Sequence, residues 1–447
     1  MAVAAMSEAD IVACWLNRVI TKRQFTTEED GPVTVIFPGQ PNDDHGPDFR
    51  DAIIATRYGL LAGDIEIHVA SSGWRSHRHH LDPAYNRVIL HVVYRHDTAG
   101  AAVTAAGRKV PTLSLERNLS VFTGGTIAPP LPRLDAILPC HNAAGKINKQ
   151  CLEEIFITAG QERFLKKAEA FQQRLENNEP QQVLFESLMS ALGYTRNSEP
   201  MLHLAQAIPL RVLEQLPVDG EATCAGILLG AAGLLPSQRS YRIAGKSHNY
   251  VNHLELAWKE TGMKQVLVES DWHFSKVRPG NYPVRRLVAI ATLLRRNEAG
   301  RLFPAVMATL SQPDMLQDKR YLTSMFIVPA AGYWRKYLDF GQRCTGIPPA
   351  LCGAGRASDI IINVIFPLAL AWYRQEGQSE KATAIAAAYA AYPDIEDNTH
   401  LRRLETRLGI KHRTTVPAVQ RQGLLHIEKN YCASGTCHSC PLALDYR

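Results

Sequence analysis

The sequence has no long uninterrupted apolar run. Among its 447 residues there is no stretch of about 18 uncharged apolar residues, the length that a membrane-spanning helix needs. Glu8 and Asp10 stand where a secretory signal peptide requires its apolar stretch. The sequence therefore predicts a soluble protein of the cytoplasm without a membrane partner.

The chain contains few cysteines, and their number is odd. The nine cysteines are scattered through a large chain, whereas disulfide frameworks are typical of small secreted domains with even cysteine counts. We expect these thiols to be reduced or bound to metal. Apolar residues make up 46% of the chain, which is enough for two or three domains with their own cores and excludes global disorder.

Residues 1–125 have no excess of basic residues, whereas the rest of the chain has one. Residues 1–125 carry 12 Lys and Arg against 14 Asp and Glu, whereas the remaining residues carry 37 against 29. This basic surplus could hold a polyanion such as nucleic acid. Solvated helix faces alone could also account for it.

Residues 1–122 have the pattern of a mixed α/β domain. Apolar residues at helical spacing between residues 11 and 20 predict an opening helix. Short apolar runs bounded by turn residues predict five strands, at 33–37, 52–56, 64–69, 87–94 and 110–115. A histidine-rich connection separates the third strand from the fourth.

The pattern changes after residue 122. Residues 123–140 contain two glycines and four prolines, and proline neither continues a helix nor pairs inside a sheet. We expect a linker there, then a mainly helical region at 141–410, and a second linker with a cysteine-rich tail at 411–447. Helices are predicted at 151–176, 181–193, 221–235, 284–296 and 359–373.

Acidic and histidine residues gather in the N-terminal part. Alternation along a strand places Asp64, Glu66 and His68 on one face and the isoleucines between them on the other. Carboxylates suit Mg²⁺ or Mn²⁺, and imidazole widens the choice to Zn²⁺ or Fe²⁺. The alternative is the solvated face of an edge strand beside a polar loop. Seven of the 16 histidines fall within residues 45–96: His45, His68, His77, His79, His80, His91 and His96.

Three cysteines lie close together near the C-terminus. Cys432, Cys437 and Cys440 fall within nine residues, and thiolates are soft ligands for zinc or a [4Fe-4S] cluster. Three ligands are one short of a closed site, and Cys140 is a candidate for the fourth. The alternative is a set of reduced cysteines on a mobile tail.

A segment rich in cations and aromatic rings lies at residues 272–287. Such a mixture suits a groove that binds a nucleic-acid strand, with phosphates on the cations and bases on the rings. The alternative is a structured loop that caps the helix beginning near Pro283. The candidate nucleic-acid-binding residues are Lys276, Arg278, Arg285 and Arg286.

Several stretches resemble an uncharacterised bacterial domain-of-unknown-function family, number 2851. They are GPDF (46–49), GDIEIH (63–68), DPAYNRVILHVV (82–93) and QGLLHIEKNYCASGTCHSCPL (422–442). The resemblance covers essentially the whole chain. It implies no mechanism, because the family has no known activity.

A second resemblance covers about 90 residues. Pro47-Asp48, 17 intervening residues and then Glu66-Ile67-His68 are similar to the PD-(D/E)XK nuclease pattern, and the expected order of helix and strands is that of its core. The resemblance implies Asp48 and Glu66 as ligands of Mg²⁺ or Mn²⁺, with Glu8 as an accessory acid. His68 stands where that family has lysine, which puts hydrolysis in more doubt than metal binding. The remaining accessory candidates are His77, His79, His80 and His91.

We therefore expect a metal-dependent nuclease-like protein that acts on or binds nucleic acid, with Asp48, Glu66 and His68 as catalytic residues. Asp64 would be an additional metal ligand. One rival is a catalytically inert protein that binds nucleic acid or serves in assembly. Another is a metal-dependent hydrolase or oxygenase of small molecules, since acids and histidines on strands also serve those enzymes.

Overall fold

In the computed structural model the chain forms two compact units. The first contains residues 1–147, 407–409 and 427–447, and the second contains residues 148–406 and 410–426. The structure describes residues 24–42, 46–119, 147–216, 220–239, 249–274, 279–296, 301–343, 349–393, 416–432 and 439–444, with the single residues 8, 11, 12, 15, 140, 145, 346, 401, 404 and 405 and residues 408–410. Apart from Cys140, the predicted linker at 123–140 lies outside this set.

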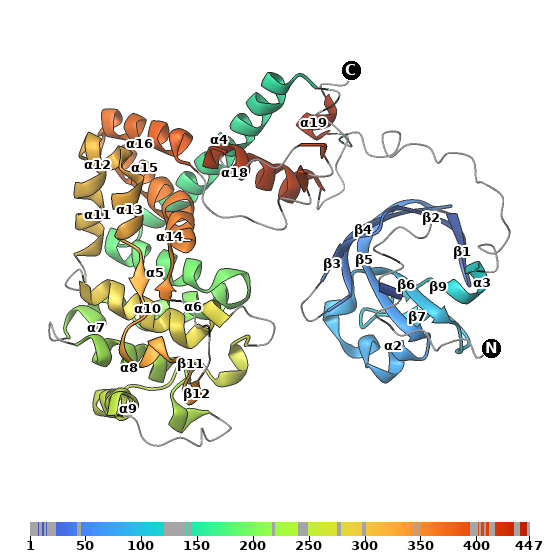
Figure 1. The fold of residues 1–447 in the computed structure, drawn as a ribbon, viewed down its shortest axis with the longest axis horizontal. Coiled ribbons are helices and arrows are strands. Elements are labelled where there is room, and N and C mark those ends of the chain that lie inside the picture. Colours follow the sequence, from blue (N-terminus) through green and yellow to red (C-terminus); the bar gives the residue numbers. More distant parts are fainter. Residues whose placement is uncertain are drawn as a thin grey trace. The chain divides into compact units, whose positions relative to one another are not determined.

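The first unit is built on a seven-stranded mixed sheet (Figure 1). Its first strands form an antiparallel meander, and the last two are added in parallel beside β5. All five predicted strands are confirmed; β1 and β3 were not predicted, because they are too short to show a pattern. The order is β1 (Gln24–Thr27), β2 (Gly31–Phe37), β4 (Phe49–Thr56), β5 (Gly59–Ala70), β6 (Val88–Arg95) and β9 (Thr112–Ser114), with β3 (Gln40–Pro41) beside β4.

The two faces of β5 have different surroundings. Ile65 and Ile67 are buried in an apolar core that also contains Ile11 and Trp15 of the opening helix. Glu66 and His68 alternate with them and therefore lie on the opposite face. The connection from β5 to β6 contacts this polar face, and it consists of α2 (Gly73–Ser76), η1 (His79–Leu81) and η2 (Pro83–Tyr85).

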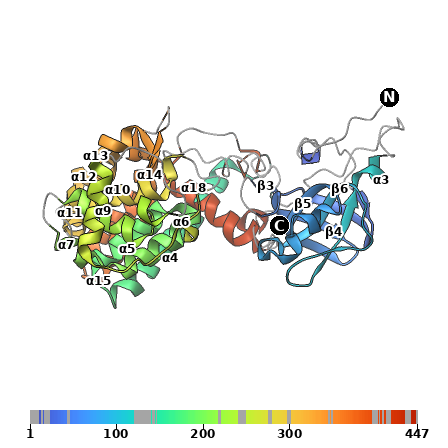
Figure 2. The ribbon, with the colours of Figure 1, turned by 90° about the horizontal axis from the view of Figure 1, so that it is seen from below.

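The second unit is mainly helical, and its helices pack against one another in both views (Figures 1 and 2). All five predicted helices are confirmed. They are α4 (Lys149–Leu175), α5 (Pro180–Leu192), α8 (Glu221–Ala231), α10 (Pro283–Arg296) and the stretch α14 (Ala354–Ile360), π-helical turn (Ile361–Ile365) and α15 (Phe366–Gln375). Further helices are α6 (Tyr194–Ala207), α7 (Leu210–Glu214), α9 (Asn249–Thr261), α11 (Leu302–Leu310), α12 (Pro313–Gln317), α13 (Lys319–Ser324) and α16 (Ser379–Ala391).

The helical stretch Ala354–Gln375 is long and apolar enough to cross a membrane by length and composition alone. However, 72% of its apolar window is buried inside the protein. This burial is what a core helix of a globular unit shows, so the stretch is weak evidence for a membrane span.

The predicted linker after residue 410 is partly a helix. Residues Ala418–Ile427 form α18, which lies against α4, and Gly423 leaves room for the carbonyl of Phe156. Arg163 Nε donates to Gln422 Oε1 at 2.8 Å. The prediction of a linker was wrong for these residues because their apolar side chains alternate with polar ones. The apolar stripe is recognisable only from the packing against α4.

Candidate metal and catalytic site

Two carboxylates meet where β4 begins beside β5. The backbone N–H of Asp48 donates to Glu66 Oε2 at 3.0 Å, and the backbone N–H of Ile67 donates to Asp48 Oδ2 at 2.9 Å. Each side chain is thus held by the strand that carries the other. Glu66 is buried, with 5% of its surface exposed. The structure therefore brings together the two acids that the nuclease pattern aligns.

Both carboxylates are hard to ionise in the absence of a cation. Burial raises the pKa of Glu66 to about 8 and the pKa of Asp48 to about 6. Burial is the largest cause of both values, to which the charge of Glu66 contributes at Asp48 and the charge of Glu8 contributes at both residues. Because a nearby positive charge favours ionised carboxylates, this pair of donors fits a divalent cation.

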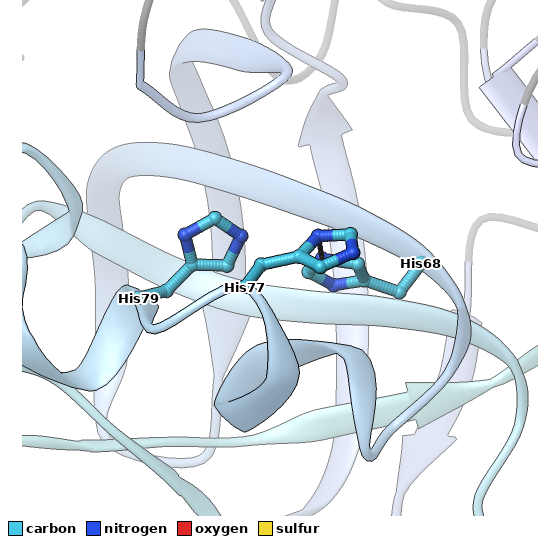
Figure 3. Close-up of side chains that lie close together, drawn as sticks. All are labelled: His68, His77 and His79. Carbon is cyan, nitrogen blue, oxygen red and sulfur yellow. Dashed lines mark hydrogen bonds between the residues drawn. The ribbon is translucent and has the colours of Figure 1, made fainter.

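Three imidazoles, those of His68, His77 and His79, lie close together on the polar side of β5 (Figure 3). His68 Nε2 is 3.0 Å from His77 Nδ1, and one ligand atom of each of His68, His77 and His79 lies within 4.8 Å of the others. Glu66 Oε1 is 3.1 Å from His79 Nε2 and 3.6 Å from His68 Nε2. We call these four side chains the histidine–glutamate cluster. Its imidazoles add nitrogen donors to the carboxylate pair.

His91 supports His68 from β6. His68 Nδ1 and His91 Nε2 are 2.9 Å apart, and His91 is fully buried. Burial, with a smaller contribution from neighbouring histidines, lowers the pKa of His68 to about 2 and the pKa of His91 to about 3. Both rings are therefore neutral at pH 7, the form in which imidazole binds metal.

The backbone between β5 and β6 aims the other two histidines. Arg78, between His77 and His79, adopts a left-handed conformation with φ of 62°, which is unfavourable for a residue with a side chain and is common at functional sites. His79 stacks on Tyr85 with ring centroids 3.8 Å apart. Trp74, which precedes these residues in the connection, is 2% exposed. These contacts fix the positions of the histidine side chains.

Other predicted residues of this region lie elsewhere. Asp64 Oδ1 accepts a hydrogen bond from the backbone of Asp51 at 3.1 Å, at a β-bulge where Arg50 and Asp51 stand opposite Asp64. The Asp64 carboxylate therefore accepts a backbone hydrogen bond of the bulge, and Asp64 does not belong to the histidine–glutamate cluster. His80 is also outside it, and His45 lies outside the described residues.

Two cations stand on the segment that carries the histidines. Arg75 and Arg78 are exposed, and among the described residues neither has an ion-pair partner within 4.0 Å. Exposed and unpaired guanidinium groups can bind an anionic group such as phosphate. Neither arginine was predicted from the sequence, although both lie among the histidines between His68 and His79.

The predicted nucleic-acid-binding surface at residues 272–287 is wrong for two of its four candidate residues, Arg285 and Arg286. Arg285 and Arg286 are 0% and 4% exposed. Arg285 Nη1 donates to the carbonyls of Trp334 and Tyr337 at 2.9 Å, and Arg286 donates to Leu351, Tyr194 and Asn281. Buried guanidinium groups are stable only when their donors are used in this way, so these two arginines hold the second unit together. Lys276 and Arg278 lie outside the described residues.

The cysteines of the predicted zinc or [4Fe-4S] site belong to the first unit. Residues 140, 432 and 440 all fall within that unit, although they lie far apart in the sequence. Cys140 and Cys440 are buried and Cys432 is half-buried. Cys437 lies outside the described residues, so the ligand set stays a prediction.

Comparison with known proteins gives a family and no activity. A family model described as "Protein of unknown function (DUF2851)" matches residues 8–399. No match was found among curated proteins or among solved structures. The matched range contains the whole described sheet, the histidine–glutamate cluster and most of the helical unit. The chain therefore belongs to the DUF2851 family.

Proposed function

We propose that the first unit is a metal-dependent hydrolase of the nuclease type, which acts on phosphodiester bonds of nucleic acid. The observation that carries the proposal is the carboxylate pair of Asp48, just before β4, and Glu66, in the adjacent strand β5. Each carboxylate accepts a backbone hydrogen bond from the segment that carries the other, and burial raises the pKa of both. Acidic pairs of this kind are the usual ligands of Mg²⁺ and Mn²⁺ in phosphoryl transfer.

The arrangement of strands supports the proposal. The PD-(D/E)XK resemblance implies a helix, a meander of three strands and a further strand after a connection. In the first unit β2, β4 and β5 are antiparallel neighbours, and β6 pairs with β5 in parallel. Asp48 precedes β4 and Glu66 lies within β5, which agrees with the places of the two acids in that pattern.

The residues of the site have separable tasks. A divalent cation would supply Lewis acidity to the phosphate oxygens and to the attacking water. Asp48 and Glu66 would hold that cation, because each carboxylate is fixed by a hydrogen bond from the backbone next to the other. His68 is neutral at pH 7, so it can orient a neighbour by hydrogen bonding but cannot replace the permanent charge of a lysine.

The surroundings of the site favour an anionic substrate. Arg75 and Arg78 are exposed on the segment that carries His77 and His79, so they can contact phosphates near the carboxylates. This contact replaces the surface that the sequence suggested at Arg285 and Arg286, which are buried.

A metal-dependent hydrolase of small phosphodiesters is a second candidate. It is favoured by the imidazoles of His68, His77 and His79, because nitrogen-rich sites also occur in enzymes of small molecules. The chemistry at the cation would be the same, and the two candidates differ in the length of substrate that they accept.

Cleavage assays test the proposal. The full-length protein is incubated with labelled single- and double-stranded DNA and RNA, and with bis(p-nitrophenyl) phosphate, in Mg²⁺ or Mn²⁺. We expect metal-dependent cleavage of nucleic acid, and a loss of at least about 100-fold in Asp48→Asn and Glu66→Gln. Glu116→Gln, an exposed acid, is the matched control.

The assay separates the alternatives. Cleavage of the small phosphodiester without cleavage of nucleic acid would favour the second candidate. Binding of nucleic acid without any metal-dependent cleavage would overturn the enzyme proposal in favour of an inert binding protein.

A further inference from the structure

The histidine–glutamate cluster contains more donor atoms than a hydrogen-bonded network needs. His79 Nε2 is buried and 3.1 Å from Glu66 Oε1, yet the two atoms are not aligned for a hydrogen bond. A buried ring nitrogen without a partner is costly in a native protein. A shared cation between the two atoms would remove that cost.

Three separations within the cluster are close to those of ligands around one small ion. Two ligand atoms at about 2.1 Å from one zinc ion are about 3.4 Å apart at tetrahedral angles. Glu66 Oε1 is 3.1 Å from His79 Nε2 and 3.6 Å from His68 Nε2, and His68 Nε2 is 3.0 Å from His77 Nδ1. We propose that Glu66, His68, His77 and His79 form a centre for a transition-metal ion of the zinc class.

The donor set selects this class of metal. Mg²⁺ prefers oxygen ligands, keeps several waters and requires octahedral geometry. Three imidazoles and one carboxylate instead suit Zn²⁺ and its neighbours in the first transition row. His77 is exposed while His68 and His79 are buried, so the centre is open to solvent on the side of His77 and an ion can enter there.

Neighbouring residues hold the ligands in a binding geometry. The contact between His68 Nδ1 and His91 Nε2 directs the other nitrogen of His68 toward Glu66 and His77. Hydrogen bonds to the second nitrogen of a ligand histidine fix its tautomer and ring orientation, and their loss typically lowers metal affinity about 10- to 100-fold. His91 is therefore a positioning residue of this centre.

Glu66 would be shared by this centre, through Oε1, and by the Mg²⁺ or Mn²⁺ site with Asp48, through Oε2. The inference rests on the proposed function only for a catalytic use of the zinc-class ion, and zinc binding is measurable without cleavage. Full-length protein is stripped with a chelator and titrated with Zn²⁺ by calorimetry and with Co²⁺ by visible absorption. Cobalt bound to thiolates gives near-ultraviolet charge-transfer bands, whereas a nitrogen and oxygen site gives only the visible bands. The two spectral regions thus separate the cluster from any cysteine site.

We expect wild type to bind one ion in the cluster and His77→Gln and His79→Gln to lose its visible cobalt bands, with at least a 100-fold lower zinc affinity. His91→Gln should lower the affinity about 10- to 100-fold. His96→Gln, a half-buried histidine of the same unit outside the cluster, should bind as wild type does. Because His77 is exposed, its variant should remain folded, which circular dichroism checks.

Two results would overturn the inference. One is a wild type that binds no zinc or cobalt apart from the thiolate signal, and the other is unchanged binding in both His77→Gln and His79→Gln. Bound zinc without cleavage would leave the inference standing and remove the proposed function. The opposite outcome has two parts: Mg²⁺-dependent cleavage persists in His77→Gln, and zinc binding is unchanged in both His77→Gln and His79→Gln. It would overturn the inference and leave the proposed function standing.

Discussion

Glu66 Oε2 accepts the backbone N–H of Asp48 at 3.0 Å, across the pair of strands that carries the two acids. The bond keeps one oxygen of a buried carboxylate occupied while Oε1 remains beside His68 and His79. Burial nevertheless raises the pKa of Glu66 to about 8. The site is therefore built at a cost to the metal-free protein, and that cost is measurable.

The first prediction concerns stability against pH in the presence of a chelator. Between the ordinary pKa of 4.5 and the folded value of about 8, the folded state keeps a proton that the unfolded state releases, so stability falls as pH rises through this window. Glu66→Gln should flatten this dependence and be more stable than wild type above pH 8, by up to a few kcal/mol. Thermal melts from pH 5 to 9 check this, with Glu116→Gln as control, and parallel profiles for wild type and variant would contradict it.

The second prediction concerns the space beside His68. A Cβ at Gly73 would lie 2.6 Å from Cδ2 of the His68 ring, so Gly73→Ala should displace that ring. We expect destabilisation of about 1–3 kcal/mol and a loss of zinc affinity. Denaturant unfolding and zinc titration measure the two effects. Gly353→Ala, with no atom within 4 Å of the added Cβ, is the control, and equal behaviour of the two variants would show that the space is not needed.

The third prediction distinguishes two roles of His68. His68→Lys restores the residue of the PD-(D/E)XK pattern, but the side chain is 2% exposed and contacts His77 and His91. Because a lysine there loses both contacts and adds a buried charge, we expect weaker zinc binding and reduced cleavage. Higher cleavage than in wild type would instead assign His68 the place of the nuclease lysine.

The fourth prediction concerns Arg285. Its donors contact the carbonyls of Trp334 and Tyr337 in the interior, so Arg285→Ala leaves both carbonyls without that partner. Hydrogen bonds to charged groups contribute about 1.5–3 kcal/mol each, and we expect a loss of several kcal/mol in the unfolding of the second unit. The exposed Arg211→Ala should unfold as wild type does. If Arg285→Ala is as stable as wild type but binds nucleic acid more weakly, Arg285 would instead be a nucleic-acid-binding residue, as the sequence predicted.

The fifth prediction concerns the cysteine-rich tail. If Cys437 is a ligand together with Cys432, Cys440 and Cys140, Cys437→Ser should lose bound zinc or iron and lower the melting temperature, because metal binding contributes folding free energy. Elemental analysis and thermal melts measure both. Cys224→Ala is the control, since burial raises the pKa of Cys224 to about 12 and keeps it a thiol. Unchanged metal content in Cys437→Ser would leave the tail as reduced cysteines.

Alternation along the chain was enough to predict much of the sheet and part of the site. Ile65 and Ile67 are buried in the core and Glu66 and His68 lie on the other face, because successive residues of a strand point to opposite sides. The helices were predictable for a similar reason, since apolar stripes persisted over several turns in α4, α5 and α10. Local order of this kind is determined by neighbouring residues in the sequence.

Only the tertiary structure decided which polar residues act together. His77 and His79 converge on Glu66 because Arg78 adopts a left-handed conformation in a connection that contacts β5, whereas the equally suggestive Asp64 is taken up by the bulge at Asp51. Arg285, which the sequence pattern predicted to be a cation on the surface, is buried. The sequence alone determined the chemical groups and the face of each element, but contacts between residues distant along the chain depend on how the elements pack, and no local pattern encodes that packing.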